Sequence, residues 1–238
     1  MTVVISGASR GIGRELINFF LEKKGLKVIA LSSHPEKFRA LEKKKNFHSI
    51  KADFTIEDSI YEITEIIGTK TNEVGILINN AGLLVNKPFF KITSKELELV
   101  YRVNVFAPFM LSQQLLRFMG KKERGHIVNI GSIAGKEVYA NGNVYCATKH
   151  AVDALNKSMR IDLLPHNIKV TAVNPGMVDT EFSLVRFNGD ENRAKSVYKG
   201  LQPLKAEDIA ETIYWVASRP AHVNINDIVV MPTAQPMA

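Results

Sequence analysis

The sequence has almost no cysteine. Its 238 residues include a single one, Cys146, so an intramolecular disulfide and a cysteine-rich zinc site are both excluded. A chain of this length buries most of its apolar surface and does not need such cross-links. Scarce cysteine also fits a reducing compartment, so we expect a cytoplasmic protein without a metal centre.

Long apolar runs and an N-terminal address are also missing. No run approaches the roughly 18 residues of a membrane span, so no membrane association is expected. Met1 and Thr2 are followed at once by the apolar Val3–Ile5, without the basic region and cleavage site of a secretory signal. A composition of 45% hydrophobic and 23% charged residues is that of a globular protein. We therefore expect one domain spanning residues 1–238.

The chain is basic but has no concentrated basic segment. It carries 31 lysines and arginines against 24 acidic residues, a net charge of +7. The basic side chains are scattered, and no basic groove with interleaved aromatic residues is visible, which argues against a nucleic-acid partner. The clusters Lys43–Lys45 and Lys121–Arg124 each follow a helical pattern, where cations are favoured. We interpret most of the charge as solvated surface.

What the chain has in abundance is short apolar runs rich in β-branched residues. They lie at Thr2–Ile5, Lys27–Leu31, His48–Ala52, Ile76–Asn79, His126–Ile130, Ile168–Val173 and Asp227–Met231. Most are too continuous for half-exposed strands and predict strands buried on both faces. Helical patterns lie between them, at Arg14–Lys24, Asp58–Ile67 and Tyr145–Leu164. This alternation predicts an α/β fold: a Rossmann-type, doubly wound, seven-stranded and mostly parallel sheet with helices on both faces.

A glycine-rich turn joins the first strand to the first helix. Gly7 permits a tight turn, Gly11 lets the backbone approach a pyrophosphate, and Gly13 lets helix and strand pack closely. The helix N-terminus would offer free N–H groups to phosphates. The turn predicts a dinucleotide site, although its glycine spacing differs from G-x-G-x-x-G and a purely structural turn is the alternative. The candidate cofactor residues here are Gly7, Ser9, Arg10, Gly11, Ile12 and Gly13.

The end of the second strand discriminates between cofactors. The acidic residue that would bind the ribose of NAD is missing from Ser32–His34. Arg10 is placed to pair with a 2′-phosphate, and Ser32 and Ser33 to donate to it, so NADP(H) is favoured over NAD(H). A solvent-exposed turn residue is the alternative for Arg10. After the third strand, Asp53, followed by Phe54, either meets the adenine ring or caps the next helix.

Three side chains form a candidate catalytic group. Tyr145 and Lys149 are four residues apart, on one face of a helix. A free phenol has a pKa near 10, and a neighbouring ammonium lowers it. Ser132 follows a predicted strand, at the sheet edge where ligands bind, and its hydroxyl could hold a carbonyl oxygen. A tyrosine–lysine pair alone is a weak signal, because such pairs arise by chance.

The motifs jointly resemble the short-chain dehydrogenase/reductase family over essentially the whole chain. The residues that carry the resemblance are Gly7–Gly13, Asp53, Asn79–Gly82, Asn104, Ser132, Tyr145, Lys149, Pro175, Gly176 and Thr180. The resemblance implies that Tyr145 is the general acid in carbonyl reduction and the base in alcohol oxidation. It implies that Lys149 lowers the phenol pKa and binds the nicotinamide ribose, and that Ser132 polarises the carbonyl.

The resemblance also implies roles for the remaining motifs. Asn104 would hold a helix kink and a water that links Lys149 to solvent. The residues that would flank the adenine ribose are Asn80, Ala81 and Gly82, and those that would cover the nicotinamide are Pro175, Gly176, Val178 and Thr180. Relatives pair subunits through the helix that begins near Tyr145 and the one that contains Asn104, which implies a homotetramer or at least a homodimer.

Two stretches are similar to one subgroup. Thr180–Asp190 and Pro220–Asn226 resemble the bacterial NADP-dependent 3-hydroxy acid (serine or allo-threonine) dehydrogenases. This implies a small 3-hydroxy acid or 3-oxo acid substrate. Its carboxylate could pair with Arg186 or Lys136, and a surface salt bridge is the alternative for these residues. A 3-oxoacyl carrier-protein reductase and a sepiapterin-like carbonyl reductase are the alternatives. A non-catalytic dinucleotide sensor would be expected to lack Tyr145 or Lys149, and both are present.

Overall fold

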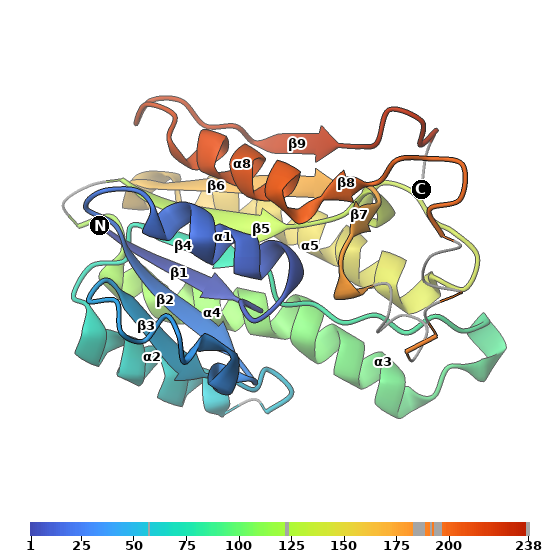
Figure 1. The fold of residues 1–238 in the computed structure, drawn as a ribbon, viewed down its shortest axis with the longest axis horizontal. Helices are drawn as coiled ribbons and strands as arrows, with labels where there is room; N and C mark the ends of the chain where they lie inside the picture. Colours follow the sequence, from blue (N-terminus) through green and yellow to red (C-terminus); the bar gives the residue numbers. More distant parts are fainter. Residues whose placement is uncertain (57, 122–123, 183–188, 191, 193–196, 237–238) are drawn as a thin grey trace.

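A seven-stranded parallel sheet runs through the protein. The computed structural model describes residues 1–238 except 57, 122–123, 183–188, 191, 193–196 and 237–238. The strand order is β3-β2-β1-β4-β5-β6-β9, and every neighbouring pair is parallel (Figure 1). The strands are β1 Thr2–Ser6, β2 Lys27–Ser32, β3 Phe47–Lys51, β4 Ile76–Asn79, β5 Gly125–Ile130, β6 Ile168–Pro175 and β9 Asp227–Val230. The predicted α/β fold is confirmed, with a sheet that is parallel throughout.

The central strands are buried on both faces, which explains their uninterrupted apolar sequences. Every residue of β1, β5 and β6 is buried. A β-branched side chain suits both sides of such a strand, because each face packs against a helical layer. The edge strand β9 is only half-buried and alternates between exposed and intermediate residues.

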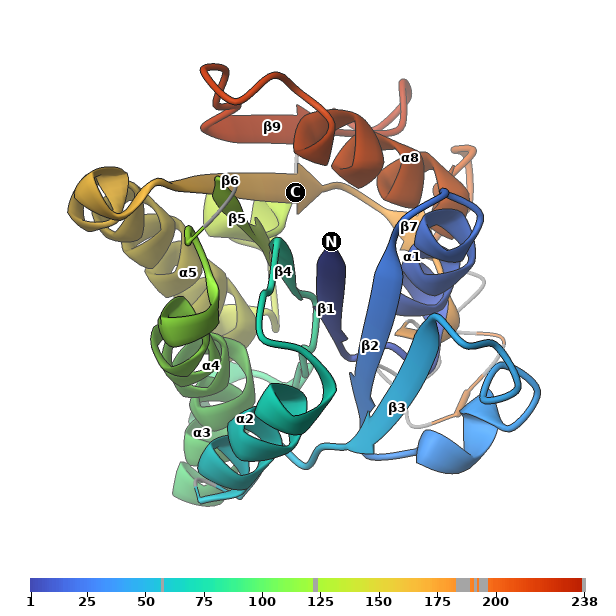
Figure 2. The ribbon, with the colours of Figure 1, turned by 90° about the vertical axis from the view of Figure 1, so that its left-hand side faces the viewer.

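Helices cover both faces of the sheet. Helices α1 (Gly11–Leu21) and α8 (Ala206–Ala217) lie on one face, and α2 (Ser59–Lys70), α4 (Ala107–Leu115) and α5 (Asn143–Asp162) on the other (Figure 2). Each face of the sheet packs against its helices in a hydrophobic core. Phe20 of α1 is buried in the core on one face, and Leu111 of α4 is buried in the core on the other face.

The other elements are η1 Pro35–Phe38, η2 Phe89–Lys91, α3 Ser94–Tyr101, η3 Arg102–Phe106, η4 Leu116–Phe118, η5 Ile133–Gly135, η6 Leu164–His166, β7 Val178–Asp179 and β8 Leu204–Lys205.

Helix boundaries depart from the sequence pattern in two ways. Helix α1 begins at Gly11, one turn before the expected Arg14, because the glycine loop itself turns into the helix. The pattern after Pro35 forms only the single 3-10 turn η1, so the expectation that Lys43–Lys45 follow a helix was wrong. Phe38 is buried against Phe47, with ring centroids 5.7 Å apart. The sequence after Phe38 lacks the extended apolar stripe that would continue a helix.

Buried asparagines link the middle of the sheet to the helices. Asn79 of β4 donates to Asn129 Oδ1 of β5 at 2.9 Å, and Asn129 donates to Asn156 Oδ1 of α5 at 2.9 Å. Asn79 also donates to Ser112 Oγ of α4 at 3.0 Å. Buried amides cost free energy unless they are bonded, so this ladder specifies one register of β4, β5 and the covering helices.

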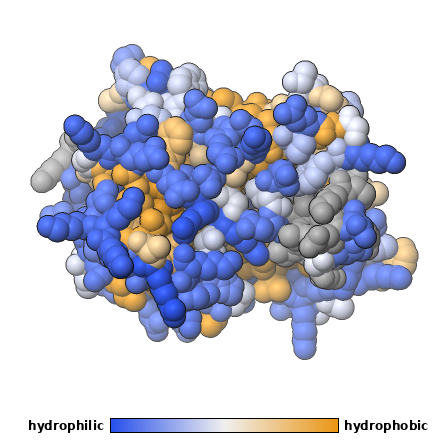
Figure 3. Space-filling model, viewed as in Figure 1, coloured by the Kyte–Doolittle hydropathy of each residue, from blue (hydrophilic) through white to orange (hydrophobic). Residues whose placement is uncertain are grey.

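Hydrophilic side chains predominate on the face of the molecule seen in Figure 3, and smaller hydrophobic areas lie between them. Within the described residues, no helix is both long and apolar enough to cross a membrane. The same residues contain no group of three or more histidine, cysteine, aspartate or glutamate side chains that could hold a metal ion.

Candidate active site

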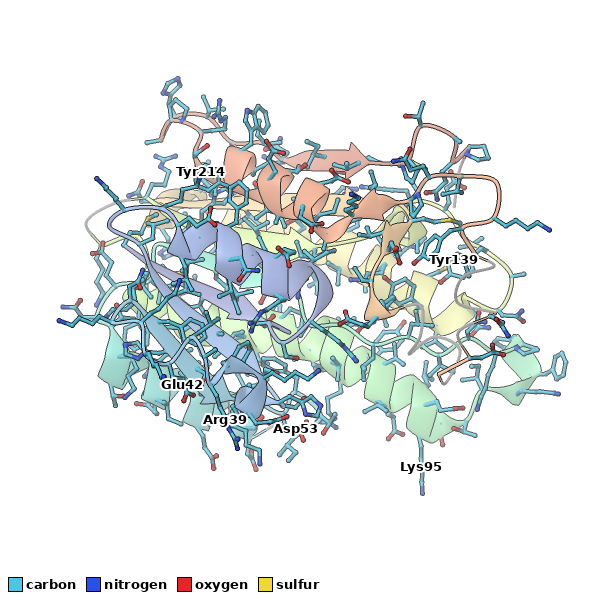
Figure 4. All side chains as sticks on the ribbon, in the orientation of Figure 1. Arg39, Glu42, Asp53, Lys95, Tyr139 and Tyr214 are labelled. Carbon is cyan, nitrogen blue, oxygen red and sulfur yellow. The ribbon has the colours of Figure 1, made fainter. Side chains whose placement is uncertain are left out.

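A cavity of about 600 Å³ lies at the carboxyl ends of the strands. Ligands bind at this edge of open α/β sheets, and the volume suits a small-molecule site. Asp53 and Tyr139, which line different parts of it, are labelled in Figure 4. The predicted site residues that line it are Gly7, Ser9, Arg10, Gly11, Ile12, Ser32, Ser33, Asp53, Phe54, Asn80, Ala81, Gly82, Ser132, Tyr145, Lys149, Pro175, Gly176, Val178 and Thr180. Gly13 and Asn104 lie behind its wall.

The glycine loop leaves no room for side chains. Gly7 has a φ of +62°, and a Cβ on it would lie 2.7 Å from the Cα of Ala81. A Cβ on Gly13 would lie 2.3 Å from the carbonyl oxygen of Gly7 and 2.7 Å from Nδ2 of Asn80. Glycine at these positions lets the first turn of α1 pack directly on the loop between β4 and α3.

Hydrogen bonds fix the loop that follows β4 to the end of β1. Ser6 Oγ accepts the backbone N–H groups of Asn80 and Ala81 at 3.0 and 3.1 Å. The Asn80 side chain donates in return to the carbonyl oxygens of Ser6 and Gly7 at 3.1 and 3.0 Å. The two loops therefore form one rigid wall of the cavity.

The N-terminus of α1 attracts a negative charge. The backbone N–H of Gly11 donates to Oε2 of Glu181 at 3.2 Å. A helix N-terminus favours anions through its dipole and its unpaired N–H groups. An anionic oxygen is thus already accommodated where the sequence predicts a phosphate, and the exposed Arg10 lines the cavity beside it. This loop fits the pyrophosphate of a dinucleotide.

The end of β2 offers hydroxyl groups to the cavity. Ser32 Oγ accepts a hydrogen bond from the backbone N–H of His34 at 3.0 Å. This bond does not use the hydroxyl proton of Ser32, which is therefore available for donation to a ligand. Ser33 is exposed on the cavity wall, and no carboxylate from the Ser32–His34 segment reaches it. This part of the wall therefore offers hydroxyl donors, which suit the 2′-phosphate of NADP. It lacks the carboxylate that would accept hydrogen bonds from the ribose hydroxyls of NAD.

Asp53 does not cap the next helix. Its Oδ1 accepts the side-chain and backbone donors of Thr55 at 2.7 and 2.9 Å, and these bonds hold the pKa of Asp53 below its ordinary value. Helix α2 begins only at Ser59, with Asp58 as its N-cap residue. The helix-cap alternative is therefore wrong, and Asp53 remains on the cavity wall.

Helix α5 carries Tyr145 and Lys149 on the face that borders the cavity. Lys149 is 6% exposed, and its Nζ donates to the carbonyl oxygen of Ile130 at 2.7 Å. The same nitrogen lies 5.6 Å from the ring centroid of Tyr145. Burial lowers the pKa of Lys149 to about 8. A cation this close to the phenol favours its ionised form.

Ser132 is the N-cap residue of the 3-10 turn η5, two residues after the end of β5. Its Oγ accepts the backbone N–H of Ala134 at 3.1 Å, so the side chain caps the turn and its orientation is restricted. Accepting this bond does not use the hydroxyl proton, which can point to a carbonyl oxygen in the cavity.

Asn104 sits inside the π-helical turn η3, between α3 and α4. Its Oδ1 accepts the backbone N–H of Leu83 at 2.7 Å. Its Nδ2 donates to the carbonyl oxygen of Leu83 at 2.8 Å and to Thr148 Oγ1 at 3.0 Å. A π-helical turn widens the backbone at functional sites, and here it connects the β4 loop to the residue next to Lys149.

Sequence reasoning missed several further residues that line the cavity, most of them apolar or aromatic. They are Leu84, Tyr139, Met177, Phe182, Val197, Tyr198 and Gln235. The rings of Tyr145 and Phe182 lie 5.9 Å apart. Phe182 falls in the stretch Thr180–Asp190 that resembles one subgroup, but nothing local signals Gln235. Its Oε1 reaches the backbone N–H of Met177, at 2.9 Å, from the C-terminal end of the chain.

One of the two expected carboxylate anchors, Lys136, does not lie at the cavity. Lys136 donates to Asp153 at 2.6 Å and to Asp227 at 2.5 Å, and it does not line the cavity. The expectation that Lys136 pairs with substrate was wrong, because two carboxylates of the protein already neutralise it. Arg186 lies outside the described residues.

Comparison with known proteins agrees with this geometry. The family model described as short chain dehydrogenase matches residues 1–189. Serine 3-dehydrogenase of Agrobacterium fabrum is 37% identical over 100% of this chain and 96% of its own. NADP-dependent 3-hydroxy acid dehydrogenase of Escherichia coli (strain K12) is 36% identical over 100% and 97%. The closed form of serine dehydrogenase complexed with NADP+ has a TM-score of 0.93 at 36% identity, covering 100% and 97%. The chain belongs to the short-chain dehydrogenase family.

Proposed function

We propose that the protein transfers a hydride between NADP(H) and a small carbonyl or alcohol substrate, a 3-oxo acid or 3-hydroxy acid. The observation that carries this proposal is the buried Lys149 beside Tyr145, on a cavity that also contains the glycine loop. The names of the similar proteins, serine 3-dehydrogenase and NADP-dependent 3-hydroxy acid dehydrogenase, support the same class of reaction.

The side chains divide the proton chemistry between them. When bound, the dinucleotide supplies or accepts the hydride. In reduction the Tyr145 hydroxyl gives its proton to the carbonyl oxygen, and in oxidation the phenolate takes it back. The Lys149 ammonium lowers the phenol pKa so that this exchange runs near neutral pH. Ser132 donates to the same oxygen, and Asn104 holds the turn that borders Lys149.

The residues that would hold the dinucleotide follow its length along the cavity. The pyrophosphate would lie on the glycine loop and the N-terminus of α1, and the adenosine part near Asp53, Phe54 and the loop Asn80–Gly82. The nicotinamide would lie under Pro175, Gly176, Val178 and Thr180. The 2′-phosphate of NADP would meet Arg10, Ser32 and Ser33.

Replacing Arg10 with alanine is expected to raise KM for NADPH about 10- to 100-fold, because a charged hydrogen bond to phosphate contributes roughly 1.5–3 kcal/mol. KM for NADH should change little, because NADH lacks the 2′-phosphate. Initial rates with both cofactors measure this. Arg39→Ala is the matched control, since Arg39 is exposed and does not line the cavity. An equal loss with both cofactors would show that Arg10 does not select the phosphate.

Steady-state kinetics test the function itself. Initial rates with NADPH or NADH are measured with 3-oxo acids, 3-hydroxy acids, acyl thioesters and pterins. We expect the highest kcat/KM for a 3-oxo acid or 3-hydroxy acid with the NADP form of the cofactor. A clear preference for acyl thioesters or pterins would favour the carrier-protein reductase or the sepiapterin-like alternative. Tight NADPH binding without turnover of any substrate would indicate a sensor.

We further propose that the chain assembles into a homotetramer or at least a homodimer. Phe106 and Phe109, at the junction of η3 and α4, are 62% and 39% exposed, and Trp215 of α8 is 44% exposed. Large exposed apolar side chains on two sides of a protein are typical of subunit contacts. Size-exclusion chromatography with light scattering checks this, and a strictly monomeric protein would contradict it.

We also infer that residues 1–238 form one domain that acts in the cytoplasm, where the buried Cys146 stays reduced.

A further inference from the structure

One carboxylate is linked by hydrogen bonds to both ends of the turn that carries Ser132, directly to one end and through Asn174 to the other. The turn, residues Ser132–Lys136, is called the serine turn below. The carboxylate belongs to Asp227, the first residue of the edge strand β9. Asp227 does not line the cavity, so any effect that it has on the reaction must act through other residues.

The first end of the serine turn reaches Asp227 through Asn174. The backbone N–H of Ser132 donates to Oδ1 of Asn174 at 3.2 Å, and Nδ2 of Asn174 donates to Oδ1 of Asp227. Asn174 lies in β6 and is only 1% exposed. A Cβ on Gly131 would lie 1.9 Å from Oδ1 of Asn174, so the glycine before Ser132 is what permits this close approach.

The last residue of the serine turn reaches Asp227 directly. Lys136 donates through Nζ to Oδ2 of Asp227 at 2.5 Å and to Oδ1 of Asp153 at 2.6 Å. Burial opposes the charge on Lys136, but hydrogen bonds to the two carboxylates outweigh it and raise the lysine pKa. Within the turn, Gly135 donates its backbone N–H to the carbonyl oxygen of Ser132 at 2.9 Å. The turn is thus closed on itself and held at both ends.

Such a clamp matters because the Ser132 hydroxyl has to lie at one place to polarise a carbonyl. An error of about 1 Å in the position of a catalytic group can cost about 100-fold in rate. A backbone hydrogen bond to β6 comes from Gly131, the residue before the serine turn, which donates to the carbonyl oxygen of Val173 at 2.8 Å. The bonds that pass through Asn174 and Lys136 add the restraint on its rotation.

We propose that Asp227 is a positioning residue for catalysis: through Asn174 and Lys136 it fixes the serine turn, and so the Ser132 hydroxyl, against the substrate carbonyl. This inference rests on the role of Ser132 under the proposed function. It adds β9, at the edge of the sheet, to the elements that determine the rate of the reaction.

A double-mutant cycle tests the inference, because it separates an effect through Ser132 from a general loss of stability. Four proteins are compared at saturating NADPH: native, Ser132→Ala, Asp227→Ala and the double variant. Asp227→Ala is expected to lower kcat by about tenfold or more in the native background, from the sensitivity of rate to misplacement. In the Ser132→Ala background it should change kcat by less than about twofold. NADPH affinity should not change in either background.

Two further variants keep the test decisive. Lys157→Met removes a lysine, 62% exposed, that bonds the same Asp153 at 2.6 Å but is not part of the serine turn, and its kcat should equal that of the native protein. If Asp227→Ala does not fold, Lys136→Met replaces it in the cycle and removes only the direct bond. Equal losses of kcat in both backgrounds would overturn the inference. An unchanged kcat in Ser132→Ala itself would instead remove Ser132 from the proposed function, and the inference with it.

Discussion

Tyr145→Phe is expected to lower kcat for carbonyl reduction by about 10²- to 10⁴-fold, the contribution of a positioned general acid. The variant removes only the hydroxyl. The ring keeps its contacts with Ala134, Cys146 and Phe182, so the fold and the cavity should be preserved. NADPH affinity, followed by the fluorescence of the bound nicotinamide, should change little. The rate is followed by the loss of NADPH absorbance with the best substrate of the panel.

Tyr214→Phe is the matched control for this prediction. Tyr214 lies on α8, where it packs against Phe19 and Phe20 and does not line the cavity (Figure 4). Its kcat should equal that of the native protein. If Tyr145→Phe kept most of its kcat, Tyr145 would not be the proton donor, and Ser132 or a water would have to take that role.

The features that the sequence predicted well depend on local patterns. β-branched runs such as Val3–Ile5 identify buried strands because nearly every side chain in them must be apolar. The glycines at 7, 11 and 13 follow the first strand directly, so their purpose can be inferred from the turn that the backbone must make. Tyr145 and Lys149 are brought together by one helical turn alone.

The features that sequence reasoning missed depend on contacts between distant segments. Lys136 lies near Ser132 in the sequence and was expected to face the substrate. Its partners Asp153 and Asp227 come from α5 and β9, and only the order of the strands brings them together. Gln235 reaches the cavity for the same reason, because β9 runs beside β6 and returns the C-terminal segment to Gly176. No local pattern carries such information.

Lys149→Met is expected to remove nearly all activity with only a small change in the free energy of unfolding. The ammonium would no longer lower the pKa of Tyr145, so kcat should fall by about 10²-fold or more. The folded protein, however, holds this lysine at a pKa of about 8, below the ordinary 10.5, because burial disfavours the charge. At roughly 1.4 kcal/mol for each pKa unit, the buried ammonium costs on the order of 3 kcal/mol near pH 7. Methionine removes that cost and leaves the carbonyl oxygen of Ile130 unpaired, a loss of about 1–3 kcal/mol.

The pH dependence of unfolding separates these contributions. Below about pH 8 the lysine is charged in both the folded and the unfolded protein, so the cost of burial is fully present. Between about pH 8 and 10.5 the folded protein releases the proton while the unfolded chain still binds it, so the unfolding free energy of the native protein relative to Lys149→Met must rise with pH. Urea unfolding at both ends of this range measures the difference.

The exposed Lys95 of α3 provides the control for that measurement, because Lys95→Met removes a charge that is not buried and should leave the pH dependence unchanged. At neutral pH we expect the unfolding free energy of Lys149→Met to lie within about 2 kcal/mol of the native value, since the lost hydrogen bond offsets most of the relieved burial cost. A much larger destabilisation, with no relative change between about pH 8 and 10.5, would mean that the ammonium is stabilised by its surroundings. In that case the buried ammonium of Lys149 would not lower the stability of the folded protein, and its effect on the pKa of Tyr145 would carry no cost in stability.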